Sequence, residues 1–191
     1  MAQFDASDSK IRASDGAVAE FPSRDVLEER ASAYSEWSER VRRERPVGHE
    51  TIVTRADPLN WAPLNKPLAE CTVALVSTGG VHLKSQEPFA VYEEAGDWSS
   101  RSIPGDADTR DLVVTHTHYA TQDALQDVNV MFPLDRLREL ADQGTVARAS
   151  SLHFGFMGFI PDPTLLLRET APAAGRELQR RGVDVVVLTP G

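Results

Sequence analysis

The chain has 191 residues, of which 41% are hydrophobic, and this is enough for one domain with its own core. Its formal net charge of −9 argues against nucleic acid or an anionic membrane as a partner, because both bind basic surfaces. It contains no apolar run of roughly eighteen residues and no signal-peptide pattern, so we predict a cytoplasmic protein.

The sequence of the first 70 residues predicts three segments, none of which forms a hydrophobic core of its own. Residues 1–22 are rich in Asp, Ser and Ala and predict a disordered acidic tail. Residues 23–45 predict an amphipathic helix, because four apolar side chains recur at helical spacing. These side chains are Leu27, Tyr34, Trp37 and Val41. The helix could cover its own domain or pair with a second copy, and we favour a homo-oligomer. Residues 46–70 predict an extended, Pro-rich connector.

Residues 71–191 predict an α/β domain with an open, mostly parallel, Rossmann-like sheet and helices on both faces. Short, continuous apolar runs alternate with helical patterns, as in sheets buried on both sides. The first expected strand begins at Thr72, and three more are expected at 111–115, 145–149 and 183–188. Helices are expected at 132–144 and 164–181, and Pro172 should bend the second helix. The only cysteine, Cys71, lies at the start of the first strand, and we interpret it as structural.

Four of the five histidines follow predicted strands. In open parallel sheets, ligands bind beyond the carboxyl ends of the strands. We therefore expect His82, His116, His118 and His153 to meet at one edge of the sheet. A catalytic or substrate-contacting role is predicted for His116, His118 and His153, and a substrate-binding role for His82 and Tyr119.

The spacing of His116 and His118 allows a second interpretation. Two residues that are two positions apart on an extended segment point to the same side. Together with His153 they could bind a divalent metal such as zinc or iron, with His82, Asp123 or Asp127 completing the set. A histidine that only donates to a backbone carbonyl would have the same sequence pattern.

The stretch Ser77-Thr78-Gly79-Gly80 follows the first predicted strand. Its backbone N–H groups could bind an anion such as a substrate carboxylate, or the glycines could form a plain turn. It matches neither of the common phosphate-binding glycine motifs, so nucleotide binding is not supported.

Several long strings resemble the selenoprotein B family, the substrate-specific subunits of glycine, sarcosine, betaine and D-proline reductases. They are WAPLNKPL, CTVALVSTGGVHLKSQEPF, HTHYATQDALQDVNVMFPLDRLRELADQGTV and SSLHFGFMG. The resemblance covers Trp61 to Gly191. It implies reductive cleavage of a C–N bond, in which a selenocysteine or cysteine expels the amine and a dithiol resets the enzyme.

The resemblance also implies a redox motif directly after a strand resembling VDVVVLTPG, and this sequence ends at Gly191. Three explanations compete: a selenocysteine codon read as a stop or a shortened chain, a natural short form that uses its histidines, or a partner chain that supplies the motif. A TGA codon followed by an open frame encoding cysteines would support the first explanation.

Three functions therefore stay open. The first is a reductase-like protein acting on a small amino acid or betaine-type substrate with a partner reductase subunit or dithiol donor. The second is a metal-dependent, non-redox enzyme built on the histidines. The third is a non-catalytic partner subunit that assembles through the 23–45 helix.

Overall fold

The computed structural model describes residues 10–12, 18–20, 62–93, 96–117, 119, 121–160 and 163–190. The chain divides into two units, Met1–Trp61 and Ala62–Gly191. In the first unit, strands β1 (Lys10–Arg12) and β2 (Val18–Glu20) form an antiparallel pair within the segment predicted to be a tail. The predicted 23–45 helix and the connector up to residue 61 lie outside the described residues.

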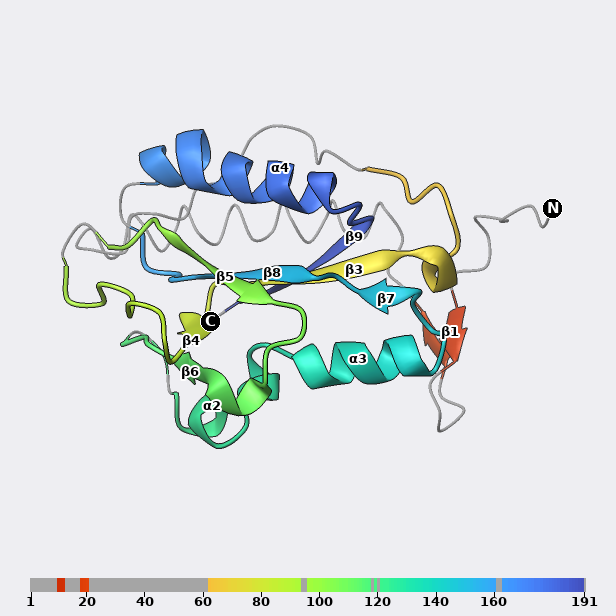
Figure 1. Ribbon diagram of the computed structural model, residues 1–191, viewed down its shortest axis with the longest axis horizontal. Coiled ribbons are helices and arrows are strands. Elements are labelled where there is room, and N and C mark those ends of the chain that lie inside the picture. The colour runs from red at the N-terminus through yellow and green to blue at the C-terminus, as the bar shows by residue number, and fades with distance from the viewer. Residues whose placement is uncertain are drawn as a thin grey trace. The chain divides into compact units, whose positions relative to one another are not determined.

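The second unit is organised around strand β3 (Thr72–Ser77). On one side, β9 (Val185–Thr189) pairs with β3 in parallel, from Val73 opposite Val185 to Ser77 opposite Thr189. On the other side, β7 (Arg148–Ala149) and then β8 (Leu152–Phe156) pair with it, also in parallel. Strand β5 (Ser100–Pro104) pairs antiparallel with β8 at the outer edge (Figure 1). The prediction of a mostly parallel sheet is confirmed.

Strands β7 and β8 are one strand interrupted by a bulge. Val73 lies opposite Ala149 and Val76 opposite Phe154, so five residue steps on one strand accompany three on β3. The extra residues break the ladder between Ala149 and Phe154, and side chains must satisfy backbone groups that a regular strand would pair.

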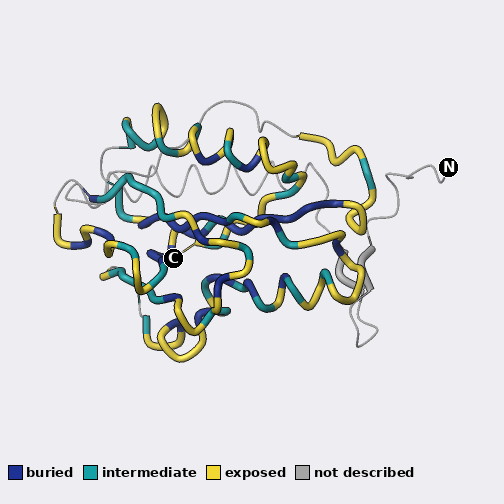
Figure 2. Tube along the Cα trace, in the orientation of Figure 1, coloured by how far each residue is buried: buried dark blue, intermediate teal, exposed yellow. Residues whose placement is uncertain are grey.

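Helices cover both faces of this sheet, as predicted (Figure 1). Helix α3 (Leu134–Asp142) packs Leu134 and Leu137 in one core cluster with Val73 and Leu75. Helix α4 (Ala171–Arg180) packs on the opposite face with Ala74, Phe154 and Phe156. A π-helical turn, η4 (Leu166–Thr170), precedes α4, whose first turn contains Pro172. Figure 2 shows β3 buried between the exposed outer sides of α3 and α4.

A separate two-stranded sheet contains β4 (Val81–Leu83) and β6 (Leu112–Val114), paired antiparallel. The prediction that 111–115 belongs to the parallel sheet is therefore wrong. Gly80, at φ 73°, turns the chain after β3 so that β4 leaves the sheet and crosses one of its faces. The segment that carries His116 therefore follows β6 of this two-stranded sheet and not a strand of the main sheet.

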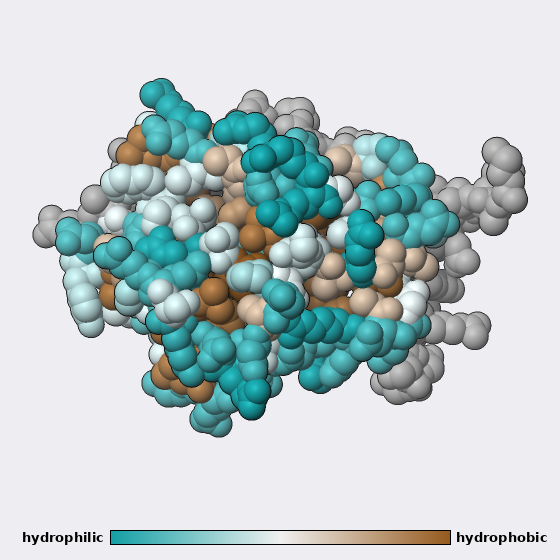
Figure 3. Space-filling view, viewed as in Figure 1, coloured by the Kyte–Doolittle hydropathy of each residue, from teal (hydrophilic) through white to brown (hydrophobic). Residues whose placement is uncertain are grey.

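Short elements complete the unit. They are η1 (Leu68–Glu70), η2 (Thr109–Asp111), α2 (Gln122–Gln126) and η3 (Val128–Val130). Figure 3 shows hydrophilic residues over most of one face, with apolar residues visible mainly above the sheet between α4 and α3. Within the described part of the chain, no helix has the length and apolar character needed to cross a membrane.

Gly155 provides a test of how β4 crosses β8. A Cβ atom at Gly155 would overlap the backbone carbonyl of Val81, which cannot move without shifting β4. We expect Gly155→Ala to lower the free energy of unfolding in urea by about 2–4 kcal/mol. The control is Gly175→Ala in α4, where nothing lies within 4 Å and the change should add about 0.5–1 kcal/mol. Equal stability of the Gly155 variant and the parent would contradict this crossing.

Candidate functional site

The carboxyl ends of three parallel strands meet where β3 runs into residues 78–80. The N–H of Thr78 donates to the carbonyl of Thr189 at 2.9 Å, which joins the loop to the end of β9. The N–H of Gly80 donates to the carbonyl of Phe156 at 2.8 Å, which joins it to the end of β8. Open parallel sheets bind ligands at this edge, and a site at this location stays a prediction.

The backbone of this loop is already occupied. Besides the bonds of Thr78 and Gly80, the N–H of Gly79 donates to Oγ of Ser77 at 3.1 Å. All three N–H groups therefore have protein acceptors, and in this conformation they cannot form the anion-binding loop considered from the sequence. Their bonds make the loop a rigid floor.

His116 and Tyr119 lie on this floor. The hydroxyl of Tyr119 donates to the carbonyl of Gly79 at 2.7 Å, and its ring centroid lies 4.6 Å from that of His116. Burial raises the pKa of Tyr119, so its hydroxyl stays protonated and remains a donor at neutral pH. The structure thus brings together His116, Tyr119 and the glycine loop.

Gly158, just after β8, lies close to both Thr78 and His116. A Cβ atom built at Gly158 would lie 2.9 Å from the carbonyl oxygen of Thr78 and 3.6 Å from Nε2 of His116. A side chain at this position would therefore displace the loop, and glycine allows the two segments to approach each other this closely. We call the set of Thr78, Gly79, His116, Tyr119 and Gly158 the rim site.

Two hydroxyl side chains lie beneath the loop. Ser77 and Thr189 occupy equivalent positions on β3 and β9, so their side chains share one face of the sheet. Oγ of Ser77 donates to the carbonyl of Met131 at 3.4 Å, and Oγ1 of Thr189 is buried without a hydrogen-bond partner among the described residues. Ser77 is fully buried, so its predicted substrate contact would have to act through the loop above it.

His82 does not face the rim site. It is 2% exposed, and both ring nitrogens are hydrogen-bonded, one to Leu83 in β4 and the other to Thr115 just after β6. Direct contact with a substrate, as predicted from the sequence, would require the β4–β6 sheet to open.

His153 lies within β8 and not beyond the end of a strand, so its predicted placement at the sheet edge is wrong. It is 0% exposed, and its Nδ1 accepts the N–H of Leu75 at 2.9 Å. The bulge before it leaves that N–H without a backbone acceptor, and the imidazole takes the place of a carbonyl. Its Nε2 is buried without a hydrogen-bond partner in the described part of the chain. The imidazole meets the ring of Phe132 edge to face, at 5.9 Å between centroids.

These contacts leave the metal interpretation with little support. Nδ1 of His153 is engaged in the sheet, and His118 lies outside the described residues. Among the residues that the structure describes, no group of three or more His, Cys, Asp or Glu side chains is placed to hold an ion. Metal binding by His116, His118 and His153 stays a prediction.

Cys71 lies at the amino end of β3, opposite the rim site. It is 0% exposed, and its Sγ donates to the carbonyl of Pro67 at 3.3 Å. This burial agrees with the structural role predicted for it.

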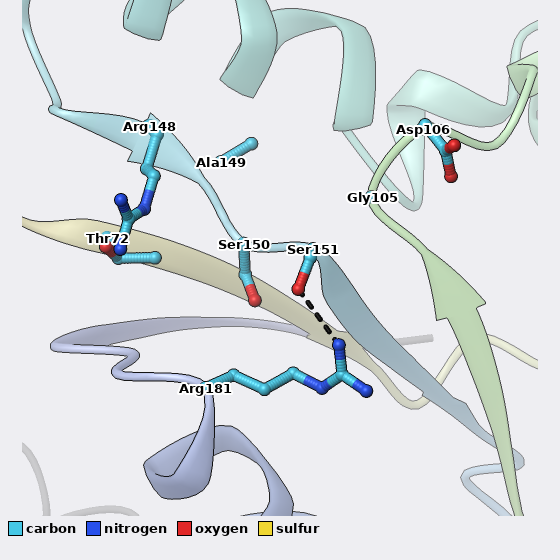
Figure 4. A pocket seen from close by; sticks show the side chains of 8 residues that line it. All are labelled: Thr72, Gly105, Asp106, Arg148, Ala149, Ser150, Ser151 and Arg181. Atoms are coloured by element: carbon cyan, nitrogen blue, oxygen red, sulfur yellow. Dashed lines mark hydrogen bonds between the residues drawn. The ribbon is translucent and has the colours of Figure 1, made fainter.

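A cleft of about 500 Å³ also lies at the amino end of β3, along the bulge between β7 and β8 (Figure 4). Its lining includes Arg148, Arg181 and Ser151, and Arg181 donates to Oγ of Ser151 at 3.0 Å. The sequence analysis missed this cleft because no local motif joins residues so far apart in the chain.

The buried position of His153 predicts a pH dependence of stability. Burial, and secondly the charge of Arg138, lower its pKa from 6.5 to about 4. Between these pH values the unfolded chain binds a proton that the folded chain does not, so stability is complete above pH 6.5 and declines as the pH falls toward 4. The loss attributable to this group is about 3 kcal/mol.

The measurement is urea unfolding of the parent and of His153→Gln at several pH values from 7 to 4. Glutamine keeps an acceptor for the N–H of Leu75 but does not titrate. We expect the difference in stability between the two proteins to change across this range. Parallel curves would show that His153 is not buried as a neutral acceptor.

Comparison with known proteins gives one family and two relatives. Residues 41–191 match the model of the glycine/sarcosine/betaine reductase selenoprotein B family. The D-proline reductase subunit gamma of Acetoanaerobium sticklandii is 42% identical over 142 residues, which are 74% of this chain and 57% of the relative. The glycine reductase complex component B subunit gamma of Carboxydothermus hydrogenoformans is 30% identical over 131 residues, 66% of this chain and 29% of the relative. The chain thus spans little more than half of the first relative and under a third of the second. No solved structure matches it.

Proposed function

The chain belongs to the glycine/sarcosine/betaine reductase selenoprotein B family, and we propose that it handles the substrate in a reductase that cleaves a C–N bond of a small amino acid or betaine-type compound. The observation that carries the proposal is the rim site. Its residues come from separate parts of the matched region and converge at the edge where three parallel strands end. The relatives are named as subunits of D-proline reductase and of the glycine reductase complex.

In this proposal His116 donates a proton to the departing amine of an amino-acid substrate when that amine is neutral. A neutral amine leaves a carbon atom readily only once it is protonated, and imidazole is the side chain best suited to supply that proton near neutral pH. The quaternary ammonium of a betaine-type substrate needs no proton to leave, and His116 then only contacts the substrate. The tilted ring contact with Tyr119, at 4.6 Å between centroids, restrains the imidazole of His116. We propose that Thr78, the exposed residue of the loop, contacts the substrate carboxylate. His118 is a second candidate, and its position lies outside the described residues.

The reducing equivalents require thiols or a selenol that this sequence does not contain. Its single cysteine, Cys71, is buried at the other end of β3. We propose that a partner reductase subunit or dithiol donor presents a thiolate or selenolate at the rim site. That atom bonds to the carbon as the C–N bond breaks, and the amine leaves with its proton. A second thiol then releases the carbon as a C–H product, so that two thiols become a disulfide and the substrate carbon gains two electrons.

Strand β9 supports assembly with such a partner. Its apolar run is typical of a strand buried on both sides, yet Val186, Val187 and Leu188 are 40%, 41% and 73% exposed. Within the described residues β9 pairs with β3 alone, and it carries neither the charge nor the proline that usually protects a sheet edge. Another subunit that covers this strand would also reach the rim site, because β9 ends at Thr189 beside the loop. The same surface would serve a non-catalytic partner subunit.

The role of His116 is tested by measuring binding of glycine, sarcosine, betaine and D-proline to the purified chain by calorimetry. We expect at least one of them to bind, and His116→Gln to weaken that binding at least about tenfold, since it removes a group that contacts the ligand. Its melting temperature should stay close to that of the parent.

His153→Gln is the matched control in this experiment. It removes a buried imidazole, so it should lower the melting temperature while leaving ligand affinity nearly unchanged. A His116 variant that loses stability and keeps affinity would make His116 structural. Failure of all four compounds to bind would contradict substrate handling by this chain.

The exposed strand is tested with Leu188→Lys. If β9 is an assembly surface, the chain purified alone should self-associate at micromolar concentration, and a lysine at this edge should reduce the mass measured by light scattering. Leu167→Lys is the control, because Leu167 is also exposed, at 59%, but lies in η4. An equal effect of both variants would show that general surface hydrophobicity, and not β9, is responsible.

A further inference from the structure

His82 is the one buried histidine whose two ring nitrogens are both hydrogen-bonded within the described residues. It lies in β4 opposite Val113 of β6. Its Nδ1 lies 2.8 Å from the carbonyl oxygen of Leu83, and its Nε2 lies 2.8 Å from Oγ1 of Thr115. The ring also meets Phe89 edge to face, at 5.8 Å between centroids. The imidazole is therefore held in one orientation.

The two partners determine where the protons lie. A carbonyl oxygen only accepts hydrogen bonds, so Nδ1 of His82 must carry a hydrogen atom. In the neutral ring Nε2 is then an acceptor, and the Thr115 hydroxyl donates to it. His153 has the opposite arrangement, because its Nδ1 accepts the N–H of Leu75. When both rings are neutral, the two buried histidines are therefore different tautomers.

Thr115 connects this buried ring to the rim site. It directly precedes His116, and its N–H donates to the carbonyl of Gly80 at 2.9 Å. A Cβ atom at Gly80 would overlap the carbonyl of Thr115 and lie 3.3 Å from Cβ of His116, so the two segments are in close contact. The backbone of Thr115 is thus hydrogen-bonded to the glycine loop, and its side chain is hydrogen-bonded to His82. The other end of the segment is held by Tyr119, which donates to Gly79.

We propose that His82 is a positioning residue of the rim site: through the Thr115 hydroxyl it sets the place and orientation of His116 beside Gly158. The inference rests on the proposed function of His116, and it replaces the substrate contact expected for His82. Without the bond to Thr115, the backbone before His116 keeps its link to Gly80 and the pairing of Val114 with Val81, but the side chain of Thr115 is no longer fixed by His82. The imidazole would then sample several orientations, and its proton would meet the leaving amine less often.

The first test needs no variant. Long-range ¹H–¹⁵N spectra of the uniformly ¹⁵N-labelled chain at pH 7.5 distinguish the two neutral tautomers of histidine. We expect His82 to be protonated on Nδ1 and His153 on Nε2. A His82 ring protonated on Nε2 alone would overturn the proposal, because Nδ1 would then face the carbonyl of Leu83 without a hydrogen atom and the imidazole could not keep this orientation.

The second test compares Thr115→Val, which keeps the shape but loses the hydroxyl, with Thr115→Ser, which keeps the hydroxyl. We expect Thr115→Val to shift the ring resonances and titration midpoint of His116, and to weaken binding of whichever of glycine, sarcosine, betaine or D-proline binds the parent about tenfold. Thr115→Ser should restore both. The control is Val113→Ala, at the position opposite His82 in β6. It loosens packing without removing the hydrogen bond between His82 and Thr115, and it should leave the His116 resonances in place.

The outcomes separate the two proposals. His116 resonances that do not respond to Thr115→Val, or that respond equally to Val113→Ala, would overturn the positioning role even if substrate binds. If none of the four compounds binds the parent while Thr115→Val still shifts His116 and Thr115→Ser reverses the shift, the positioning role is supported and the substrate proposal fails. Should Thr115→Val not fold, the tautomer of His82 in the parent decides.

Discussion

The arrangement depends on β3 being paired on both sides and on how the chain leaves it. Parallel strands pair with β3 on both sides, and each of the three N–H groups in the loop that follows donates to a neighbouring acceptor. These bonds fix the loop backbone, which Tyr119 contacts through its hydrogen bond to Gly79, and Tyr119 in turn contacts His116. Pre-organisation of this kind lowers the cost of ordering a site when a ligand binds.

The three histidines with described positions share a neighbourhood and differ in their roles. His153 repairs a broken ladder inside the sheet, and the low pKa that follows from its burial makes it a poor proton donor at neutral pH. His82 is hydrogen-bonded within β4 and to Thr115, at the start of the segment that follows β6. Of these three, only His116 lies on the rim, beside Tyr119 and close to Gly158.

Local pattern carried the prediction of the sheet and of its helices, and it failed where strand pairing is decided over long distances. The run of 183–188 is almost continuously apolar and the helix of 132–144 has a clear helical period, so their type was predictable. The antiparallel pairing of β4 with β6 was not, because three-residue strands have too few side chains to show a period. Strand β5 was not predicted, because its sequence is mostly polar, and the bulge that places His153 inside β8 leaves no mark in composition.

The sequence by itself determined the fold class, the family and the set of polar residues that follow β3, because these depend on hydrophobic period and on strings of residues that recur in relatives. Only the tertiary structure decided which of those residues are buried and which lie on the rim. Burial, hydrogen-bond partners and the close approach at Gly158 arise from segments far apart in the chain. An imidazole has the same letter whether it completes a sheet, supports a loop or faces solvent, and its surroundings alone assign the role.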